Sequence, residues 1–456
     1  MGLTDRFRHP LIPVLLAVGL TLPWVISDLT GAAGESFSEL TVVAVAGIAV
    51  LGASFLLAWG AETAEKDVPR AFAIAVLAVL AVAPEYAVDA LYAWQAGSGE
   101  ATAEACAQFT AEQIENEINS LASACHSANL AVANMTGANR ILIGLGWSGI
   151  AMFTLFRAGR NEDPAVESRD GFLASRVNLD PSISTEIAFL FFATVWAFFV
   201  PLGGGIGALD MGVLVGLYLI YIGIILKGDV DDNDHQVGVP AYFQAKARHI
   251  RIPIVLTLFA YSGILIFTAV EPFAHGLETL GQQFGIPSFF MIQWIAPLAS
   301  ESPELIVVAY LVNKARSTAG FNALISSKLN QWTLLIGTLV VVFSIAYGGY
   351  SQLPFDAKQS AEIWITAAQS LFALSILINF NISIREAIVL LVLFISQVIL
   401  EFLIIRGFAI PFTSRELLLG YAVAYLVFAL ALFVYRRHSL QLLFGRLAET
   451  VKSVRG

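Results

Sequence analysis

Apolar residues along this chain gather into long runs instead of alternating with charged ones. About 12 of these runs have the length that a helix needs to cross a bilayer, roughly 20 residues. They span residues 11–29, 38–60, 70–95, 128–156, 183–201, 207–227, 252–275, 287–313, 318–347, 360–380, 384–406 and 414–435. Because backbone polar groups inside lipid must be satisfied within the segment itself, such runs predict helices. The sequence therefore predicts an all-α polytopic membrane protein with about 12 transmembrane helices.

The first run follows Arg6 and Arg8, as the apolar part of a signal peptide would. It is longer than a typical signal sequence allows, and no clear cleavage site of small residues follows it. We therefore interpret 11–29 as a first spanning helix.

Composition agrees with a membrane protein, since 57% of the residues are hydrophobic and 13% are charged. No connecting segment is long enough for a soluble catalytic domain, so we expect a protein that is not an enzyme. The formal net charge of -10 argues against a nucleic-acid partner. The expected partners are inorganic cations and the lipid bilayer, and we expect a monomer.

Orientation follows from the positive-inside rule. Alternate connections, starting with the amino-terminal one, hold most of the 25 lysine and arginine residues. This bias predicts a multi-pass protein of the cell membrane with both termini in the cytoplasm.

The connection 97–127 falls on the opposite, external side and holds five glutamates but no lysine or arginine. Its apolar residues recur at near-helical spacing between Phe109 and Leu121, which predicts an external amphipathic helix, either a vestibule cap or a partner surface. Cys106 and Cys125 are the two cysteines of the chain. A disulfide between them and two free thiols are both compatible with the sequence.

Two parts of the chain match each other. A Pro-Glu pair lies midway in the third and eighth runs, at Glu85 and Glu304, and the next run holds an asparagine, Asn139 or Asn330, with a glycine seven residues later. Five crossings separate the two Pro-Glu runs, so they point in opposite directions. The sequence thus predicts two inverted five-helix repeats whose matching residues meet near the bilayer midplane, where transporter sites lie.

We divide the chain accordingly. The predicted parts are a first helix with its flank (1–37), an N-terminal repeat (38–227), an acidic cytoplasmic linker (228–251), a C-terminal repeat (252–406), and a last helix with a cytoplasmic tail (407–456). The acidic stretch Asp229–Asp234 lacks the glycine and the closing glutamate of an EF-hand loop, which favours a solvated linker over a calcium sensor.

Oxygen-bearing side chains in the matching runs form a candidate cation site. A proline has no amide hydrogen, so the carbonyls of Leu80 and Ala299 become free acceptors. A carboxylate at bilayer depth costs roughly 2.5–3.5 kcal/mol, which argues that it is used. An all-oxygen set without histidine or cysteine suits Ca²⁺, as cargo and not as a resident cofactor. The candidate ligands are Glu85, Asp89, Asn139, Ser300, Glu301, Glu304, Ser326 and Asn330.

These motifs resemble those of the sodium/calcium exchanger family, in the cation/calcium antiporter superfamily. That family carries two inverted repeats, each with a Gly-Thr-Ser-x-Pro-Glu helix followed by a Gly-Ser-Asn helix. The resemblance implies a ten-helix core, alternating access and exchange of Ca²⁺ against Na⁺. It places the family's paired glutamates on Glu85 and Glu304, and its second-helix polar residue on Asn139 and Asn330.

The chain departs from that pattern at several positions. Residues 81–83 lack the usual hydroxyls, Glu301 stands at a serine position, and Met135 stands where the second helix usually has a serine. Asp89 and Glu301 can replace the missing oxygens. These departures leave the coupling ion open between Na⁺ and H⁺.

Two basic residues lie inside the same runs. Arg140 is about 100° around the helix from the preceding asparagine and can pair with Asp89 or Glu301, in the place of a cation. Lys328 is about 200° from the asparagine two residues later, so we expect it to face away from the site.

The sequence therefore predicts a secondary active antiporter that exchanges Ca²⁺, or a similar divalent cation, for Na⁺ or H⁺ by alternating access. The alternatives are an H⁺-coupled exchanger without Na⁺ dependence, a cation channel and a transport-inactive membrane scaffold. An intramembrane hydrolase is disfavoured, because no Ser/His or metal–His constellation lies at depth.

Overall fold

The computed structural model describes residues 9–31, 37–64, 66–67, 82–157, 163–169, 173–227, 238–313 and 315–455. The acidic stretch Asp229–Asp234 and the first half of the predicted third helix lie outside the described residues. Ten described helices are long and apolar enough to cross a membrane, and one bent helix makes eleven. The third predicted span is described only in its second half, so the count of 12 stays a prediction.

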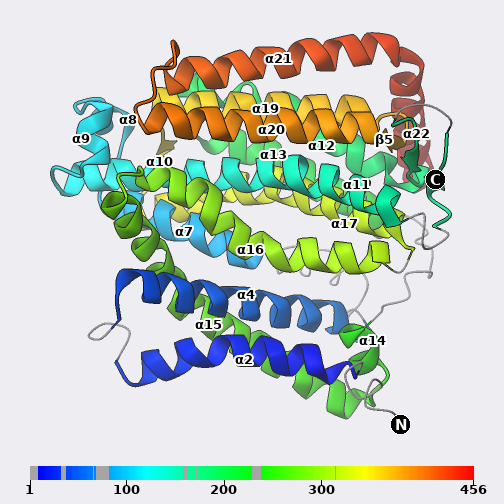
Figure 1. Ribbon diagram of the computed structural model, residues 1–456, viewed down its shortest axis with the longest axis horizontal. Coiled ribbons are helices and arrows are strands. Elements are labelled where there is room, and N and C mark those ends of the chain that lie inside the picture. Colours follow the sequence, from blue (N-terminus) through cyan, green and yellow to red (C-terminus); the bar gives the residue numbers. More distant parts are fainter. Residues whose placement is uncertain are drawn as a thin grey trace.

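Three long helices form one group along the side of the molecule, α2 (Leu11–Leu29), α4 (Glu39–Ala64) and α15 (Arg248–Gln283) (Figure 1). The first apolar run is thus a packed helix, since Trp24 of α2 is buried and its Nε1 donates to Thr268 Oγ1 of α15 at 3.1 Å. Arg251 near the start of α15 donates to both carboxyl oxygens of Asp67, at 2.5 and 2.6 Å. α15 begins at Arg248, four residues before the expected boundary of the second repeat.

The remaining helices form a larger group beside it (Figure 1). They are α7 (Ala83–Ser98), α8 (Ala103–Cys106), α9 (Ala111–Glu115), α10 (Ser120–Ile141), η2 (Leu142–Trp147), α11 (Ser148–Arg157), η3 (Pro181–Ile183), α12 (Ser184–Ala197), η4 (Val200–Gly203), α13 (Ala208–Lys227), α14 (Val239–Gln244), α16 (Ser288–Asn313), α17 (Ser317–Asn330), η5 (Gln331–Leu335), α18 (Ile336–Tyr347), α19 (Ala357–Leu377), α20 (Ile384–Ile405), α21 (Ser414–Tyr435) and α22 (Arg437–Arg455). The short α14 contacts α4 and α2 of the first group.

Two small antiparallel sheets join connections from the two halves of the chain. One has the order β1 (Val166–Glu167), β2 (Arg176–Asn178) and β5 (Asn381–Ser383), with Val177 opposite Ile382. The other pairs β3 (Gly205–Ile206) with β4 (Leu353–Pro354). Both therefore link loops that are far apart in sequence.

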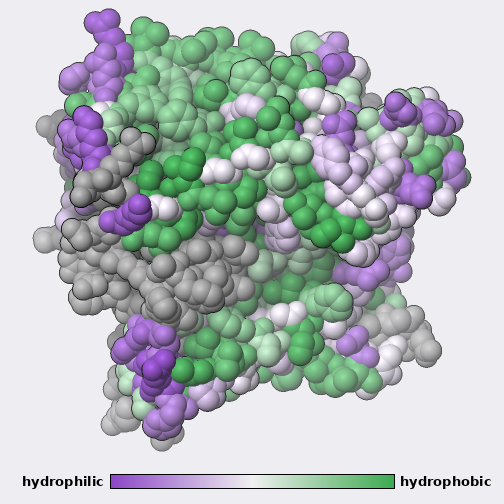
Figure 2. All heavy atoms as spheres, turned by 180° about the vertical axis from the view of Figure 1, so that it is seen from behind, coloured by the Kyte–Doolittle hydropathy of each residue, from purple (hydrophilic) through white to green (hydrophobic). Residues whose placement is uncertain are grey.

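The two chain termini lie at the same end of the molecule, which we call the terminal end, while α8 and α9 lie at the opposite end, the disulfide end (Figure 1). Figure 2 shows hydrophobic residues over much of the visible side and hydrophilic residues gathered towards the two ends. Among the exposed hydrophobic residues, Leu15 is 68% exposed, Phe267 86% and Val434 73%. Such a surface needs an apolar solvent, so the chain is membrane-embedded.

The loop at the disulfide end differs from the predicted single amphipathic helix. It holds two short helices, α8 and α9, before α10 begins at Ser120. The interruption has a local cause, because Thr110 starts a new helix through a reciprocal capping box with Gln113. Cys106 and Cys125 form a disulfide, so of the two alternatives left open the paired one is present.

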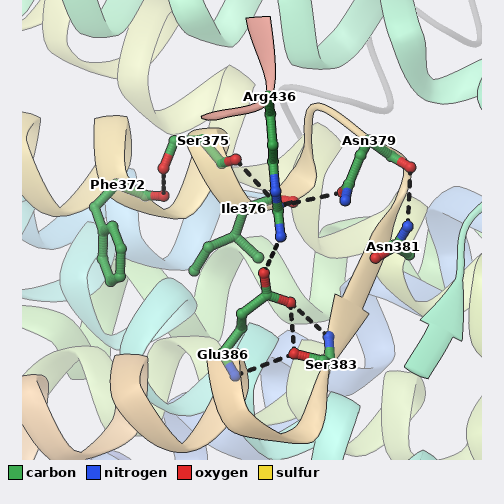
Figure 3. Close-up of polar contacts among 8 residues, drawn as sticks. All are labelled: Phe372, Ser375, Ile376, Asn379, Asn381, Ser383, Glu386 and Arg436. Carbon is green, nitrogen blue, oxygen red and sulfur yellow. Dashed lines mark hydrogen bonds and ion pairs between the residues drawn. The ribbon is translucent and has the colours of Figure 1, made fainter. Parts of the chain in front are cut away.

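Arg436 connects three helices at the terminal end (Figure 3). It follows α21, and its Nη1 donates to the carbonyl of Ile376 at 2.5 Å and to that of Ser375 at 3.3 Å, in the last turn of α19. Its Nη2 pairs with Glu386, which forms a capping box with Ser383 at the start of α20. Carbonyls in the last turn of a helix lack helical partners, so the half-buried Arg436 guanidinium satisfies them, and its positive charge interacts favourably with the negative end of the helix dipole.

Candidate cation site

Four helices of the larger group meet around the predicted site: α7, α10, α16 and α17. The contact between α10 and α16 is close, because a Cβ atom added to Gly137 would lie 1.9 Å from the carbonyl oxygen of Gln293. Only a glycine leaves room for this approach. The sequence thus brings the second helix of the first repeat directly against the Pro-Glu helix of the second.

The helices are irregular at matching points. The segments Ser288–Ser302 and Glu304–Asn313 of α16 meet at an angle of 51°, at the Pro-Glu pair. In the first repeat α7 begins at Ala83, which places the corresponding proline in its first turn. Both second helices pass into a π-helix close to their asparagine, η2 after Asn139 and η5 after Asn330. Such π segments occur often at functional sites, and their matching placement agrees with an internal repeat.

Four carboxyl side chains lie in this region. Glu85 and Asp89 of α7 and Glu301 of α16 are at most 3% exposed, and Glu304 is half-buried. The carboxyl groups of Glu85 and Glu301 lie beside each other, so the acids of the two repeats meet. Within the described part of the chain, none of the four forms an ion pair, and no donor reaches either oxygen of Glu85. The cluster therefore holds acid groups that are not neutralised by direct contact with a basic side chain.

Neutral donors contact the other three acids, each from the next helix of the same repeat. The pairs are Asn134 Nδ2 with Asp89 Oδ1 at 2.8 Å, Gln331 Nε2 with Glu301 Oε1 at 2.6 Å, and Ser327 Oγ with Glu304 Oε2 at 2.8 Å. Each of these donors also carries an oxygen that can turn towards a cation.

Lys328 lies inside the site, and the prediction that it faces away was wrong. Its side chain is fully buried, and its Nζ donates to Asn139 Oδ1 at 2.8 Å and to the Asn139 carbonyl at 3.2 Å. The electrostatic fields of Glu85 and Glu301 also act on it. The angle from Asn330 misled because it gives only a direction relative to that residue, whereas the Asn139 oxygens that Lys328 meets come from another helix, α10.

Arg140 lies outside the site, so its expected pairing with Asp89 or Glu301 was also wrong. Its Nη2 lies 2.6 Å from Glu362 Oε2 of α19, and both side chains are at most 1% exposed. Its Nη1 donates to Gln397 of α20 at 3.2 Å. One residue after Asn139, the helix has turned the side chain towards α19 and α20.

Further polar residues continue this contact into a second, largely buried group, the Arg140 network. It consists of Arg140, Glu362, Gln397, Glu401 and Lys358. Gln397 donates to Glu401 at 2.8 Å, and Lys358 lies 3.6 Å from the same carboxyl group. Two acids and two bases balance within this network, unlike in the site.

The other predicted ligands lie close by in different settings. Ser300 is half-buried and donates to the Pro297 carbonyl of its own helix at 3.3 Å. Ser326 lies by the hydroxyl of Tyr221, while Asn330 is buried. No three histidine, cysteine, aspartate or glutamate side chains among the described residues converge enough to hold a metal ion. The ligand roles of all eight candidates therefore stay predictions.

Sequence reasoning missed four residues that the structure adds to the site: Asn134, Ser327, Lys328 and Gln331. The available signal was their polarity inside otherwise apolar runs. Polar groups at this depth need partners, so each of them pointed to an acid or amide on a neighbouring helix.

A cavity of about 330 Å³ lies at the disulfide end between α7, α10 and α15. Tyr92, Glu117, His126, Glu271 and Glu278 are among its lining residues. Tyr92 follows Asp89 by three residues on α7, so the two share a face, and its hydroxyl donates to Glu278 at 2.6 Å. Polar side chains thus lead from the disulfide end towards the site.

Comparison with known proteins identifies the family. The family model described as sodium/calcium exchanger protein matches residues 112–227 and 254–403. A crystal structure of the H⁺/Ca²⁺ exchanger CAX is 39% identical, covers 97% of this chain and 98% of its own, and superimposes with a TM-score of 0.81. The structure of native YfkE, at 16% identity, covers 87% and 98% with a TM-score of 0.55, which supports the fold alone. No curated protein sequence matches the chain significantly. The family expected from the sequence is thus confirmed, and the chain belongs to the sodium/calcium exchanger family of membrane transporters.

Proposed function

We propose that this protein exchanges Ca²⁺ for H⁺ across the cell membrane. The observation that carries the proposal is the pair of buried carboxyl groups, Glu85 and Glu301, that meet from opposite repeats, while no basic side chain of the described residues is in contact with them. Two adjacent acids cannot both stay bare in a low dielectric. Protons and a divalent cation are alternative ways of neutralising them, so binding of one displaces the other.

The acids of both repeats would contribute to the Ca²⁺ site. Ca²⁺ takes about six to eight oxygens in tolerant geometry, more than the carboxyl groups alone supply. Since the acidic side chains do not converge on one point here, binding requires their rotation towards the ion. The proposed ligands are Glu85, Asp89, Glu301 and Glu304, completed by oxygens of Asn139, Asn330, Ser300 and Ser326.

Coupling follows from the cost of burying charge. An acid layer without a cation or protons is too costly to occlude in the membrane, so the two repeats can move past each other only when the site is neutralised. Protons are favoured over Na⁺ because residues 81–83 offer no hydroxyl ligands. The 39% identical structure is that of an H⁺/Ca²⁺ exchanger, which supports the same choice.

We further propose that the terminal end faces the cytoplasm. Most lysine and arginine residues of the connections lie in segments that alternate from the amino terminus. The loop with the disulfide then lies on the external, oxidising side.

The test uses purified protein in proteoliposomes whose membrane potential is clamped. An inside-acid pH gradient should drive ⁴⁵Ca²⁺ uptake, whereas an outward Na⁺ gradient at equal pH should not. Glu85→Gln and Glu304→Gln should each abolish uptake. Glu104→Gln makes the same chemical change at an exposed residue of the disulfide loop and should transport normally.

Other results would point elsewhere. Uptake driven by Na⁺ alone would establish sodium coupling in place of proton coupling. A conductance that needs no opposing gradient would identify a channel, and a folded protein without any flux would identify a scaffold. Normal uptake by Glu85→Gln would remove the assigned site.

A further inference from the structure

We infer that Lys328 is a tethered cation that occupies the place of a monovalent ion at Asn139 and thereby excludes Na⁺ from the exchange cycle. The inference rests on the proposed function, because it explains why the site would couple to protons and not to Na⁺. It concerns a residue that sequence reasoning placed outside the site.

The contacts of the ammonium group resemble those of a bound cation. Its Nζ lies on two oxygens of one residue, the side-chain oxygen of Asn139 at 2.8 Å and the carbonyl oxygen at 3.2 Å. The ring of Trp332 faces it with its centroid 4.5 Å from Nζ, a cation–π contact. Asn139 belongs to the first repeat and Lys328 to the second, so the contact lies where the repeats meet.

Charge explains why a lysine is tolerated at this depth. A buried ammonium costs several kcal/mol unless negative groups compensate it. Lys328 is fully buried, which works against its charged form, and Glu85 and Glu301 act in the opposite direction by favouring that form. These acids have no ion pair with any other basic side chain among the described residues. The charge of Lys328 and those of the acids therefore attract one another through space, as the charge of a bound monovalent ion would attract them.

The ammonium also changes how much charge the site must acquire from solution. Four carboxylates carry four negative charges, and Ca²⁺ together with Lys328 offsets three of them. Without the ammonium, one more monovalent charge is needed before occlusion, and the oxygens of Asn139 are released to bind it. A Na⁺ ion can fill that position, because amide and carbonyl oxygens are hard ligands.

Arg140 does not have this effect, although it is also buried and follows Asn139 directly. Its guanidinium is in contact with Glu362, and the Arg140 network is balanced by itself. Lys328 is thus the described basic side chain whose charge belongs to the site.

The experiment measures ²²Na⁺ binding to the purified full-length protein in detergent by scintillation proximity. The wild type should show no ²²Na⁺ binding above background, whereas Lys328→Met and Lys328→Gln should give a ²²Na⁺ signal at least tenfold above background that Ca²⁺ competes away. Lys328→Arg keeps the charge and should stay without Na⁺ binding. Lys358→Met removes the half-buried lysine of the Arg140 network and serves as the control, which should resemble the wild type.

Two results would overturn the inference: Ca²⁺-competed ²²Na⁺ binding by the wild type, or its absence from both folded variants that lack the charge. If neither variant folds, the wild type is tested for competition between Na⁺ and ⁴⁵Ca²⁺. Competition would refute the inference that Lys328 occupies the Na⁺ position, and the absence of competition would support it. Failure of the proposed function is separate, because it would appear as absent proton-driven uptake by the wild type whatever the Na⁺ binding.

Discussion

Replacing Arg140 by methionine should destabilise the protein strongly, and a second change at Glu362 should restore most of the loss. The guanidinium lies 2.6 Å from the Glu362 carboxyl group, and both side chains are at most 1% exposed. Removing one partner of such a pair leaves a buried charge without compensation, which costs about 3–5 kcal/mol. Arg140→Met also loses the hydrogen bond to Gln397, worth about 1 kcal/mol.

In the double variant Arg140→Met, Glu362→Gln no uncompensated charge remains. Its remaining deficit should be about 1–2 kcal/mol, from lost hydrogen bonds and from the lost contact of Arg140 with the Trp294 ring. The second change should thus restore about 3 kcal/mol of the stability that Arg140→Met alone removes, because the two positions are coupled. Reversible unfolding of the purified protein in mixed micelles, followed by tryptophan fluorescence, measures each free energy.

The control cycle combines Arg140→Met with Asp89→Asn, the partner that the sequence suggested. The structure predicts near-additive effects there, within about 0.5 kcal/mol, because Asp89 accepts from Asn134 and does not pair with Arg140. A larger coupling with Asp89 than with Glu362 would refute the placement of Arg140 outside the site.

Three further outcomes can be measured. The hydrogen bonds from Arg251 hold the pKa of Asp67 below its usual value of about 3.9. Their contribution to stability is therefore present above about pH 3.9 and is lost as the pH falls through the lowered pKa. Between pH 7 and pH 3 the wild type should lose more stability than Asp67→Asn, and equal losses would contradict this. Gly137→Ala should lower the free energy of unfolding by about 1–3 kcal/mol and impair Ca²⁺ uptake, since the new Cβ would lie 1.9 Å from a carbonyl oxygen of α16. In the control Gly149→Ala no atom lies within 4 Å of the new Cβ, so this variant should transport normally. In right-side-out vesicles treated with an impermeant reductant, an impermeant maleimide should label Cys106 from outside, and labelling only in inverted vesicles would reverse the proposed orientation.

The helices and the repeat were predictable because they depend on local properties of the chain. Length and continuity of apolar runs suffice to predict helices in lipid, since the backbone there has few alternatives. The Pro-Glu pairs at Glu85 and Glu304 could be recognised as candidate site residues for a similar reason, because acids are rare and costly at that depth. The family comparison confirms the resemblance drawn from these residues.

The partners of the buried polar side chains were not predictable in the same way. An angle around one helix gives a direction relative to a neighbouring residue, but the occupant of that direction depends on how all helices cross. Lys328 meets Asn139, and Arg140 meets Glu362, because α10 lies between the site on one side and α19 and α20 on the other. Glu362 itself lies more than 200 residues later in sequence, so no local pattern connects it with Arg140.

Asn139 and Arg140, which are neighbours on α10, therefore have different roles. Asn139 faces α17 and presents its oxygens to the charge of Lys328, whereas Arg140 faces α19 and α20 and is neutralised there by Glu362. A balanced pair leaves the charge that the site must acquire unchanged, while an ammonium beside acids that contact no base among the described residues changes that charge directly. The same type of residue, a buried base in a membrane helix, thus contacts an acid on a neighbouring helix in one case and, as we propose, selects the coupling ion in the other. What decides between these roles is whether an acid that contacts the base compensates it.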